Sequence, residues 1–139
     1  MRGEATIGGI TVGGQPSRDE LTSGRFRTVV NVRGAAEDGN DTAAMLSGSD
    51  VDYVHVPWTI DTVAPEDIDR MDDAIAGAEG GVLIHCAGGT RAAVAAAIIA
   101  AKRDGTGERG AMTAAAEAGY DVRGTPYGDF IRRYFTTNA

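Results

Sequence analysis

The chain has 139 residues, of which 42% are hydrophobic and 24% charged, and its formal net charge is −7. This length and balance predict one globular domain over residues 1–139, with a core that needs no disulfide or metal. The acidic charge argues against the basic face of a nucleic-acid-binding protein, and no apolar run reaches the ~20 residues that span a bilayer. We therefore expect neither nucleic acid nor membrane as a partner.

Short strands and short helices are predicted to alternate in the N-terminal half. Glycines weaken the first strand, which we place near the edge of a sheet. Ser17 and Glu20 are three residues apart, which is the capping-box pattern that begins a brief helix ending at Leu21. Strands are expected over 6–12, 27–33 and 51–56, and short helices over 17–21 and 41–46.

Longer helices are predicted in the C-terminal half, around one buried strand. Pro65 suits the first position of a helix on which Ile68, Met71 and Ile75 share an apolar face. The helix after the strand is rich in alanine and isoleucine nearly all round, so we expect it to be central and buried. The strand is expected over 82–85, and the helices over 65–79, 91–103, 108–118 and 125–135.

This alternation predicts an α/β fold with a central, mostly parallel sheet flanked by helices. In such sheets ligands bind beyond the carboxyl ends of the strands. Cys86 follows one predicted strand end, and Arg33 and residues 57–61 lie at others. We therefore expect these residues to converge at one edge of the sheet.

Cys86 is the only cysteine of the chain. A single cysteine forms no internal disulfide, and the first residues lack the apolar core of a signal peptide, so we expect a cytoplasmic protein. Only Lys102 among the thirteen basic residues is a lysine, a composition that fits a saline cytoplasm and a GC-rich genome equally well. One cysteine and two histidines without ligand spacing predict no metal, and no other cofactor is expected.

A loop of four residues, 87–90, separates Cys86 from Arg91 at the start of a helix. Its small side chains and two glycines let successive backbone N–H groups point inward around an anion. These groups, the helix dipole and the guanidinium all favour a thiolate, so Cys86 is predicted to be a nucleophile and Arg91 a bidentate phosphate clamp. A packing role for Cys86 and a surface role for Arg91 are less favoured. The candidate substrate-binding residues are Ala87, Gly88, Gly89, Thr90 and Arg33.

A carboxylic acid is also required by this chemistry. Attack of the Cys86 thiolate on phosphorus gives a phosphocysteine that water then hydrolyses, while an acid protonates the leaving oxygen and later acts as base. Asp61 is the candidate, because it lies on the loop after the neighbouring strand, although a solvated loop acid fits the position almost as well. Glu66 and Asp67 are weaker candidates, since they fall within the first turn of a helix.

Several residues near the predicted site have structural interpretations. Arg33 suits substrate contact and pairing with Glu37 or Asp38 equally well. We expect His85 to brace the loop by hydrogen bonding rather than to transfer protons. The remaining residues expected to be structural are His55 and Trp58, the latter as a packing anchor in the pocket wall.

The stretch from His85 to Arg91 resembles the loop of cysteine-dependent protein tyrosine and dual-specificity phosphatases. It is more similar to a bacterial and archaeal branch, the phosphatase-like domains joined to some NAD kinases and beta-lactamase-like hydrolases. That branch has a Gly-Gln-Pro-Ser/Thr turn, here residues 14–17, and an Asn-x-Arg strand end, here residues 31–33. The resemblance covers roughly residues 6–103 and implies a cysteine-dependent phosphatase-like fold.

By this resemblance Cys86 is the nucleophile, Arg91 the phosphate clamp and Asp61 the general acid. The chain departs from the phosphatases in having one residue fewer between Cys and Arg, a spacing that resembles rhodanese-type sulfurtransferases. It also has Ala92 where those phosphatases place a hydroxyl that assists release of the thiolate. If the Thr90 hydroxyl does not take over the role of this missing hydroxyl, slow breakdown of a phosphoenzyme is expected.

We therefore expect a hydrolase that cleaves phosphomonoesters, with a phosphorylated protein or a small phosphoester as its partner. The alternatives are sulfur transfer through a persulfide on Cys86 and a phosphate-binding module without catalysis. His85 favours the phosphatase, whereas the four-residue spacing favours the sulfurtransferase. The sequence specifies neither the phosphoester nor an oligomeric state.

Overall fold

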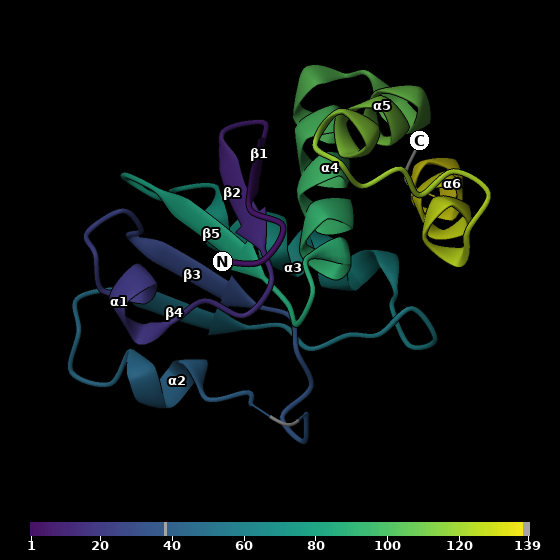
Figure 1. Ribbon diagram of the computed structural model, residues 1–139. Helices are drawn as coiled ribbons and strands as arrows, with labels where there is room; N and C mark the ends of the chain where they lie inside the picture. The colour runs from purple at the N-terminus through teal and green to yellow at the C-terminus, as the bar shows by residue number, and fades with distance from the viewer. Residues whose placement is uncertain (38, 138–139) are drawn as a thin grey trace.

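The computed structural model describes residues 1–37 and 39–137, which form a five-stranded sheet with helices on both faces (Figure 1). The strands are β1 (Ala5–Ile7), β2 (Ile10–Gly13), β3 (Thr28–Asn31), β4 (Asp52–His55) and β5 (Val82–His85). The helices are α1 (Arg18–Leu21), α2 (Thr42–Met45), α3 (Pro65–Ile75), α4 (Thr90–Asp104), α5 (Gly107–Glu117) and α6 (Pro126–Thr137).

The strands lie in the order β1-β2-β5-β3-β4, and every neighbouring pair is parallel except β1 and β2. This confirms the predicted mostly parallel sheet. The last residues of four strands pair in one row across the sheet, which runs from Gly13 through His85 and Asn31 to His55. The loops that follow these four residues therefore leave the sheet at the same level.

The prediction of one strand over residues 6–12 is wrong. The segment is a hairpin of β1 and β2, with Gly8 and Gly9 at φ +57° and +80° in the turn between them. Two consecutive positive φ angles are those of a type I′ turn, which only residues such as glycine adopt readily and which joins adjacent antiparallel strands. The glycines therefore reverse the chain instead of only weakening a strand.

The two faces of the sheet are covered by different helices. Val29 and Leu83 contribute to a small core with Leu21 of α1 and Leu46 beside α2, whereas their neighbours Val30 and Ile84 face the core under α3–α6. Successive residues alternate between the faces, as a pleated strand requires. Both faces are buried, so the inner strands read as continuous apolar runs.

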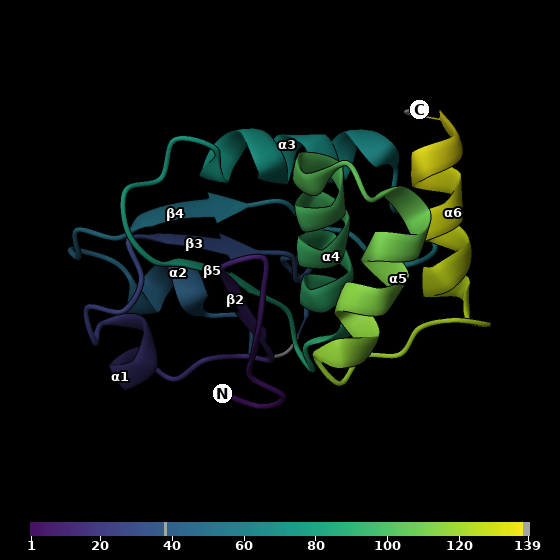
Figure 2. The same cartoon turned by 90° about the horizontal axis from the view of Figure 1, so that it is seen from above.

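Helix α4 is the buried centre of the larger core, as predicted. Its residues 92–101 are all buried, and α5 and α6 lie beside it in turn (Figure 2). The N-terminal capping box of α1 is also present as predicted. Helix α3 ends at Ile75, four residues before the predicted end at Glu79. Of the helices in the described parts of the chain, none combines the length and the apolar character needed to cross a membrane.

Candidate active site

Cys86 lies between the end of β5 and the start of α4. Its backbone N–H donates to the carbonyl of Gly13 on β2 at 3.2 Å, which extends the parallel pairing by one residue. Its Sγ accepts the backbone N–H of Gly89 at 3.0 Å, and only 1% of the residue is exposed. The sulfur is thus held at the positive end of a 15-residue helix, where a negative charge is stabilised.

Gly89 allows the loop to turn its N–H toward the sulfur. Its φ of +110° is a backbone conformation that other residues rarely adopt, and a Cβ here would lie 2.2 Å from the hydroxyl oxygen of Tyr120. That hydroxyl donates to the carbonyl of Gly3 at 2.5 Å, so Tyr120 connects the loop region with the N-terminus. Gly88, predicted to supply the same freedom, has no positive φ and is exposed.

The Gly-Gln-Pro-Ser turn, residues 14–17, packs against the loop that follows Cys86. The backbone N–H of Gln15 donates to the carbonyl of Ala87 at 3.2 Å. Gly14 comes so close that a Cβ on it would lie 2.6 Å from the same carbonyl oxygen, inside any normal contact distance. The glycine of the motif is therefore required by the close approach of two backbone segments.

Arg91, in the first turn of α4, is anchored across the carboxyl edge of the sheet. Its Nη1 and Nη2 donate to the two carboxylate oxygens of Glu37 at 2.8 and 3.2 Å. Nη1 also donates to the carbonyls of Trp58, at 3.1 Å, and Val32, at 3.5 Å. Its hydrogen bonds to the Glu37 carboxylate raise the pKa of Arg91 above its ordinary value. The guanidinium is thus held over loops that leave β3 and β4.

Glu37 joins the two arginines of the site. Its Oε2 accepts from Nε of Arg33 at 3.0 Å while it binds Arg91. The hydrogen bonds from Arg91, with those from Gly34 and Arg33, lower the pKa of Glu37 to about 2. Sequence reasoning named Glu37 only as a partner for Arg33. Its bond to Arg91 spans 54 positions, and no local pattern indicates it.

Arg33 is 6% exposed and takes up the structural pairing considered for it. Besides Glu37, its Nη1 donates to the side chain of Gln15 at 2.8 Å and to the carbonyl of Gly39 at 3.2 Å. Asp38, the other partner considered, lies outside the described residues. Contact between Arg33 and a substrate stays a prediction.

His85 is fully buried beneath the loop. Its Nδ1 lies 3.3 Å from the carbonyl of Cys86, and its Nε2 lies 3.1 Å from Oγ1 of Thr42. Burial, assisted by the positive charges of Arg33 and Arg91, lowers its pKa to about 4, so the ring is neutral at physiological pH. These contacts are those of a bracing residue.

The three candidate acids lie in different surroundings. Asp61 is exposed in a turn three residues after Trp58, on the loop whose carbonyl binds Arg91. Asp67 instead accepts the backbone N–H of Ala64 at 2.9 Å, which caps α3, and it forms an ion pair with Arg70. Glu66 is exposed in the first turn of α3. Asp61 therefore stays the candidate acid, because Asp67 is engaged in holding its helix.

The other two predicted structural residues, His55 and Trp58, lie at the end of β4 and on the loop after it, where His55 is exposed and Trp58 is part of the core. Nε2 of His55 donates to the carbonyl of Arg33 at 2.5 Å. Trp58 is buried, and its ring packs against Phe130 of α6 with 6.2 Å between ring centroids. Within residues 1–37 and 39–137, no group of three or more Asp, Glu, His or Cys side chains is arranged to bind a metal ion.

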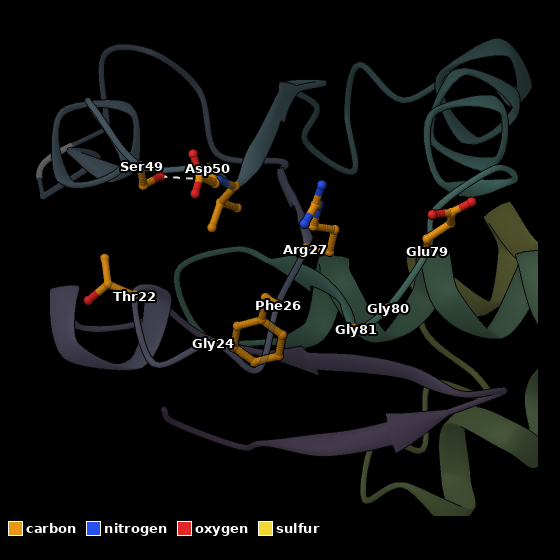
Figure 3. Close-up of a pocket in the computed structure, with 10 residues that line it drawn as sticks. Thr22, Gly24, Phe26, Arg27, Ser49, Asp50, Glu79, Gly80 and Gly81 are labelled. Atoms are coloured by element: carbon orange, nitrogen blue, oxygen red, sulfur yellow. Dashed lines mark hydrogen bonds between the residues drawn. The ribbon is translucent and has the colours of Figure 1, made fainter.

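A separate hollow of about 430 Å³ lies at the opposite edge of the sheet, near the amino ends of β3, β4 and β5 (Figure 3). It is lined by charged side chains that are all exposed, those of Arg27, Asp50 and Glu79, together with Phe26 and backbone glycines. None of the predicted site residues lines it. The thiol, the buried Arg33 and the half-buried Arg91 lie at the other edge.

A family model for the phosphatase-like domain of beta-lactamase hydrolase-like proteins matches residues 12–103. The beta-lactamase hydrolase-like protein of Xylella fastidiosa is 36% identical over 93 residues, and that of Agrobacterium fabrum 33% identical over 91 residues. Each match covers 60% of this chain and 21% of the relative, so the chain spans about a fifth of their length.

Solved structures show the same fold at low sequence identity. Tk-PTP in its active form superposes with a TM-score of 0.76 at 19% identity, covering 99% of this chain and 98% of Tk-PTP. The DUF442 protein of Shewanella putrefaciens gives a TM-score of 0.77 at 17% identity, with 99% and 93% coverage. Pseudomonas aeruginosa TpbA gives 0.68 at 21% identity, with 91% and 80% coverage. These likenesses confirm the predicted α/β fold of the protein tyrosine phosphatase type.

Proposed function

Because the chain belongs to the family of phosphatase-like domains of beta-lactamase hydrolase-like proteins, we propose that it is a phosphatase that hydrolyses phosphomonoesters through a phosphocysteine on Cys86. The observation that carries the proposal is the hydrogen bond from the Gly89 N–H to Sγ of Cys86. It lies at the start of α4, the helix whose first turn also holds the anchored guanidinium of Arg91. A nucleophile and the donors for a tetrahedral anion are thereby combined in one loop.

The first step forms the S–P bond. The thiolate of Cys86 attacks phosphorus, the bond from phosphorus to the ester oxygen breaks, and Asp61 gives its proton to that oxygen, which leaves as an alcohol or phenol. In the second step water attacks phosphorus and gives a proton to the Asp61 carboxylate, while the S–P bond breaks. Phosphate leaves and the thiolate is restored, so the atoms and the charges balance.

The charge of the crevice favours an anionic substrate in spite of the acidic chain. The guanidinium groups of Arg33 and Arg91 both lie at this edge of the sheet, where they donate to Glu37. An anion approaching a chain of net charge −7 needs such a local field. Ala87 and Gly88 are exposed, which leaves the outer side of the loop open to a phosphate carried by a protein or by a small molecule.

The test compares wild type and Cys86→Ser on an aryl phosphate. We expect hydrolysis to fall by roughly 10⁴-fold or more, because the nucleophile is lost. Vanadate should still bind, since the loop N–H groups and Arg91 remain. Unchanged hydrolysis in the serine variant would exclude the phosphocysteine.

Sulfur transfer is the second candidate, and the four-residue spacing between Cys86 and Arg91 favours it. A sulfurtransferase should consume thiosulfate in the presence of cyanide, and its mass should increase by one sulfur atom after incubation with the donor. Cys86→Ser serves as the control for both readouts. If neither activity appears while vanadate binds, the domain is a phosphate-binding module.

A further inference from the structure

Tyr120, from the connection between α5 and α6, packs on the loop that follows Cys86. A Cβ on Gly89 would lie 2.2 Å from the Tyr120 hydroxyl oxygen and 3.0 and 3.2 Å from two of its ring carbons. The phenol therefore occupies the space that a side chain at position 89 would need. Gly89 is buried, whereas Ala87 and Gly88 before it are exposed. The residue of the loop that donates to the sulfur is thus the one on which Tyr120 packs.

The backbone at the end of α5 determines where the Tyr120 side chain points. Gly119 has a φ of +94°, and its N–H donates to the carbonyl of Ala116 at 3.0 Å. The N–H of Tyr120 donates to the carbonyl of Ala115 at 2.8 Å. These two bonds around a left-handed glycine form a Schellman motif, in which the residue after the glycine turns back toward its helix. Tyr120 is accordingly half-buried against the larger core.

The hydroxyl of Tyr120 is held as well. It donates to the carbonyl of Gly3 at 2.5 Å, and a Cβ on Gly3 would lie 3.5 Å from the carbonyl oxygen of Gly88. The segment before β1 is itself fixed beside the loop, because the N–H of Gly14 donates to the carbonyl of Arg2 at 2.7 Å. Tyr120 is thus held at its backbone by the end of α5 and at its hydroxyl by Gly3.

Gly89 needs support from outside because it has no side chain of its own. Glycine has more backbone freedom than any other residue, so fixing its N–H on the sulfur costs more conformational entropy there than elsewhere. A rigid ring packed on the glycine restricts that freedom. Both Tyr120 and Gly3 lie outside residues 12–103, the range that the family model matches. The support for Gly89 therefore comes from segments on either side of the matched range.

We propose that Tyr120 is a positioning residue, whose ring holds the N–H of Gly89 on the sulfur of Cys86. The turn at the end of α5 and the carbonyl of Gly3 keep the ring in place. The inference rests on the proposed role of Cys86 as nucleophile, but it concerns how the thiolate is held. Without the ring, the N–H should spend more time turned away from the sulfur, and the thiolate should be less favoured.

The groups around the thiol that carry or could gain charge are Arg91, His85 and Tyr120 itself. Burial lowers the pKa of His85 to about 4, so its ring is neutral near pH 7. Burial, and then the charge of Cys86, raise the pKa of Tyr120 above its ordinary value, so the phenol stays protonated and keeps its bond to Gly3. Of these four groups, only the thiol should change charge between about pH 5 and 9.

The experiment compares Tyr120→Leu, which removes the ring, with Tyr120→Phe, which keeps the ring and loses the bond to Gly3. Phe135→Leu is the matched control, because Phe135 of α6 is also a half-buried aromatic residue packed against the larger core. The readouts are the hydrogen exchange of the Gly89 amide, measured by NMR, and the pH profile of alkylation by iodoacetamide. Since Cys86 is the only cysteine, alkylation reports on it alone. The midpoint of the profile, unlike its plateau, does not depend on access to the thiol.

For Tyr120→Leu we expect the Gly89 amide to exchange about two- to tenfold faster and the alkylation midpoint to rise by about 0.3–1 pH unit, the effect of one weakened hydrogen bond. Tyr120→Phe should change both readouts in the same direction by less, and Phe135→Leu should retain wild-type values. A folded Tyr120→Leu with wild-type exchange and midpoint would overturn the proposal. An equal change in Phe135→Leu would also overturn it, since general loosening of the core would then be responsible.

Tyr120→Phe is decisive if Tyr120→Leu does not fold. Faster exchange of the Gly89 amide together with a raised midpoint supports the proposal, and unchanged exchange contradicts it, because the bond to Gly3 would then do nothing for the ring. Neither readout needs turnover of a phosphoester. A wild type without phosphatase activity would therefore refute the proposed function and leave this test intact.

Discussion

The two edges of the sheet carry similar residue types in opposite surroundings. At the amino edge Arg27, Asp50 and Glu79 line an open hollow, and all three side chains are exposed. At the carboxyl edge Arg33 and Arg91 are mostly buried and share Glu37. A hollow surrounded by mobile, hydrated charges places no group accurately, whereas buried charges with fixed partners do. The proposed chemistry therefore suits the carboxyl edge better than the amino edge.

Replacing one arginine at each edge is the strongest test of this contrast. Arg91→Lys should lower kcat/KM on an aryl phosphate by about 10²- to 10³-fold, because lysine cannot bind two oxygens in the plane of a guanidinium. Arg27→Lys, at the amino edge, should change it less than about twofold. Steady-state kinetics on both variants checks this, and an equal loss in both would place the reaction outside the crevice.

The identity of the general acid is the next effect in size. Asp61→Asn should lower turnover of an alkyl phosphate by about 10²-fold, because the poor leaving group needs a proton. Aryl phosphates with acidic phenols should be affected much less. The measurement is the dependence of kcat/KM, which reports formation of the phosphoenzyme, on the leaving-group pKa, and this dependence should steepen. Equal losses on both classes of ester would show that Asp61 is structural.

Glu37, at the carboxyl edge, should make the free energy of unfolding depend on pH in the acidic range. Its pKa is about 2 in the folded chain, below the ordinary value of 4.5, so its contribution to stability is complete above about pH 4.5 and is lost as the pH falls toward 2. Glu37→Gln should lower the free energy of unfolding by about 1–2 kcal/mol at pH 7, allowing for solvent screening, and remove this part of the acid dependence. Denaturant unfolding between pH 2 and 7 measures it. Glu79→Gln, at the amino edge, should unfold like the wild type throughout.

A hydroxyl added to the carboxyl edge should give the smallest effect. Ala92→Ser restores the group that the resembling phosphatases have after the arginine, and it should speed phosphoenzyme breakdown by up to about tenfold, the worth of one hydrogen bond. In the wild type we expect a burst of released phenol followed by slow turnover. Stopped-flow assays should show a smaller burst and a faster steady state in Ala92→Ser. Ala93→Ser, in the next buried position, should leave both phases unchanged.

Local patterns were sufficient for much of the fold. The apolar run of β5 was predicted at its observed bounds, and the buried helix after it follows from side chains that are apolar nearly all round. Where the prediction was wrong, glycine was the cause. Gly8 and Gly9 form a turn inside an apparent strand, and α3 ends two residues before Gly77. Glycine permits several conformations, and the tertiary structure selects among them.

The candidate site divides in the same way. The placement of Cys86 and Arg91 around a helix start could be predicted, because strand, loop and helix follow one another directly in the sequence. Long-range pairs could not, since Glu37 reaches Arg91 from a loop after β3, and Thr42 reaches His85 of β5 from α2. Only tertiary packing brings these residues together. Loop sequences have no periodic pattern from which the hydrogen-bond partner of a side chain could be predicted.

The row of paired strand ends, from Gly13 through His85 and Asn31 to His55, has a consequence for insertions and deletions in related chains. One residue more or less in any of these strands would shift its end by about 3.3 Å and exchange the faces of its side chains. The loop at that end would then leave the sheet out of step with its three neighbours. Length variation should therefore concentrate at the amino edge and in the helix connections, where the chain can absorb it without moving the thiol.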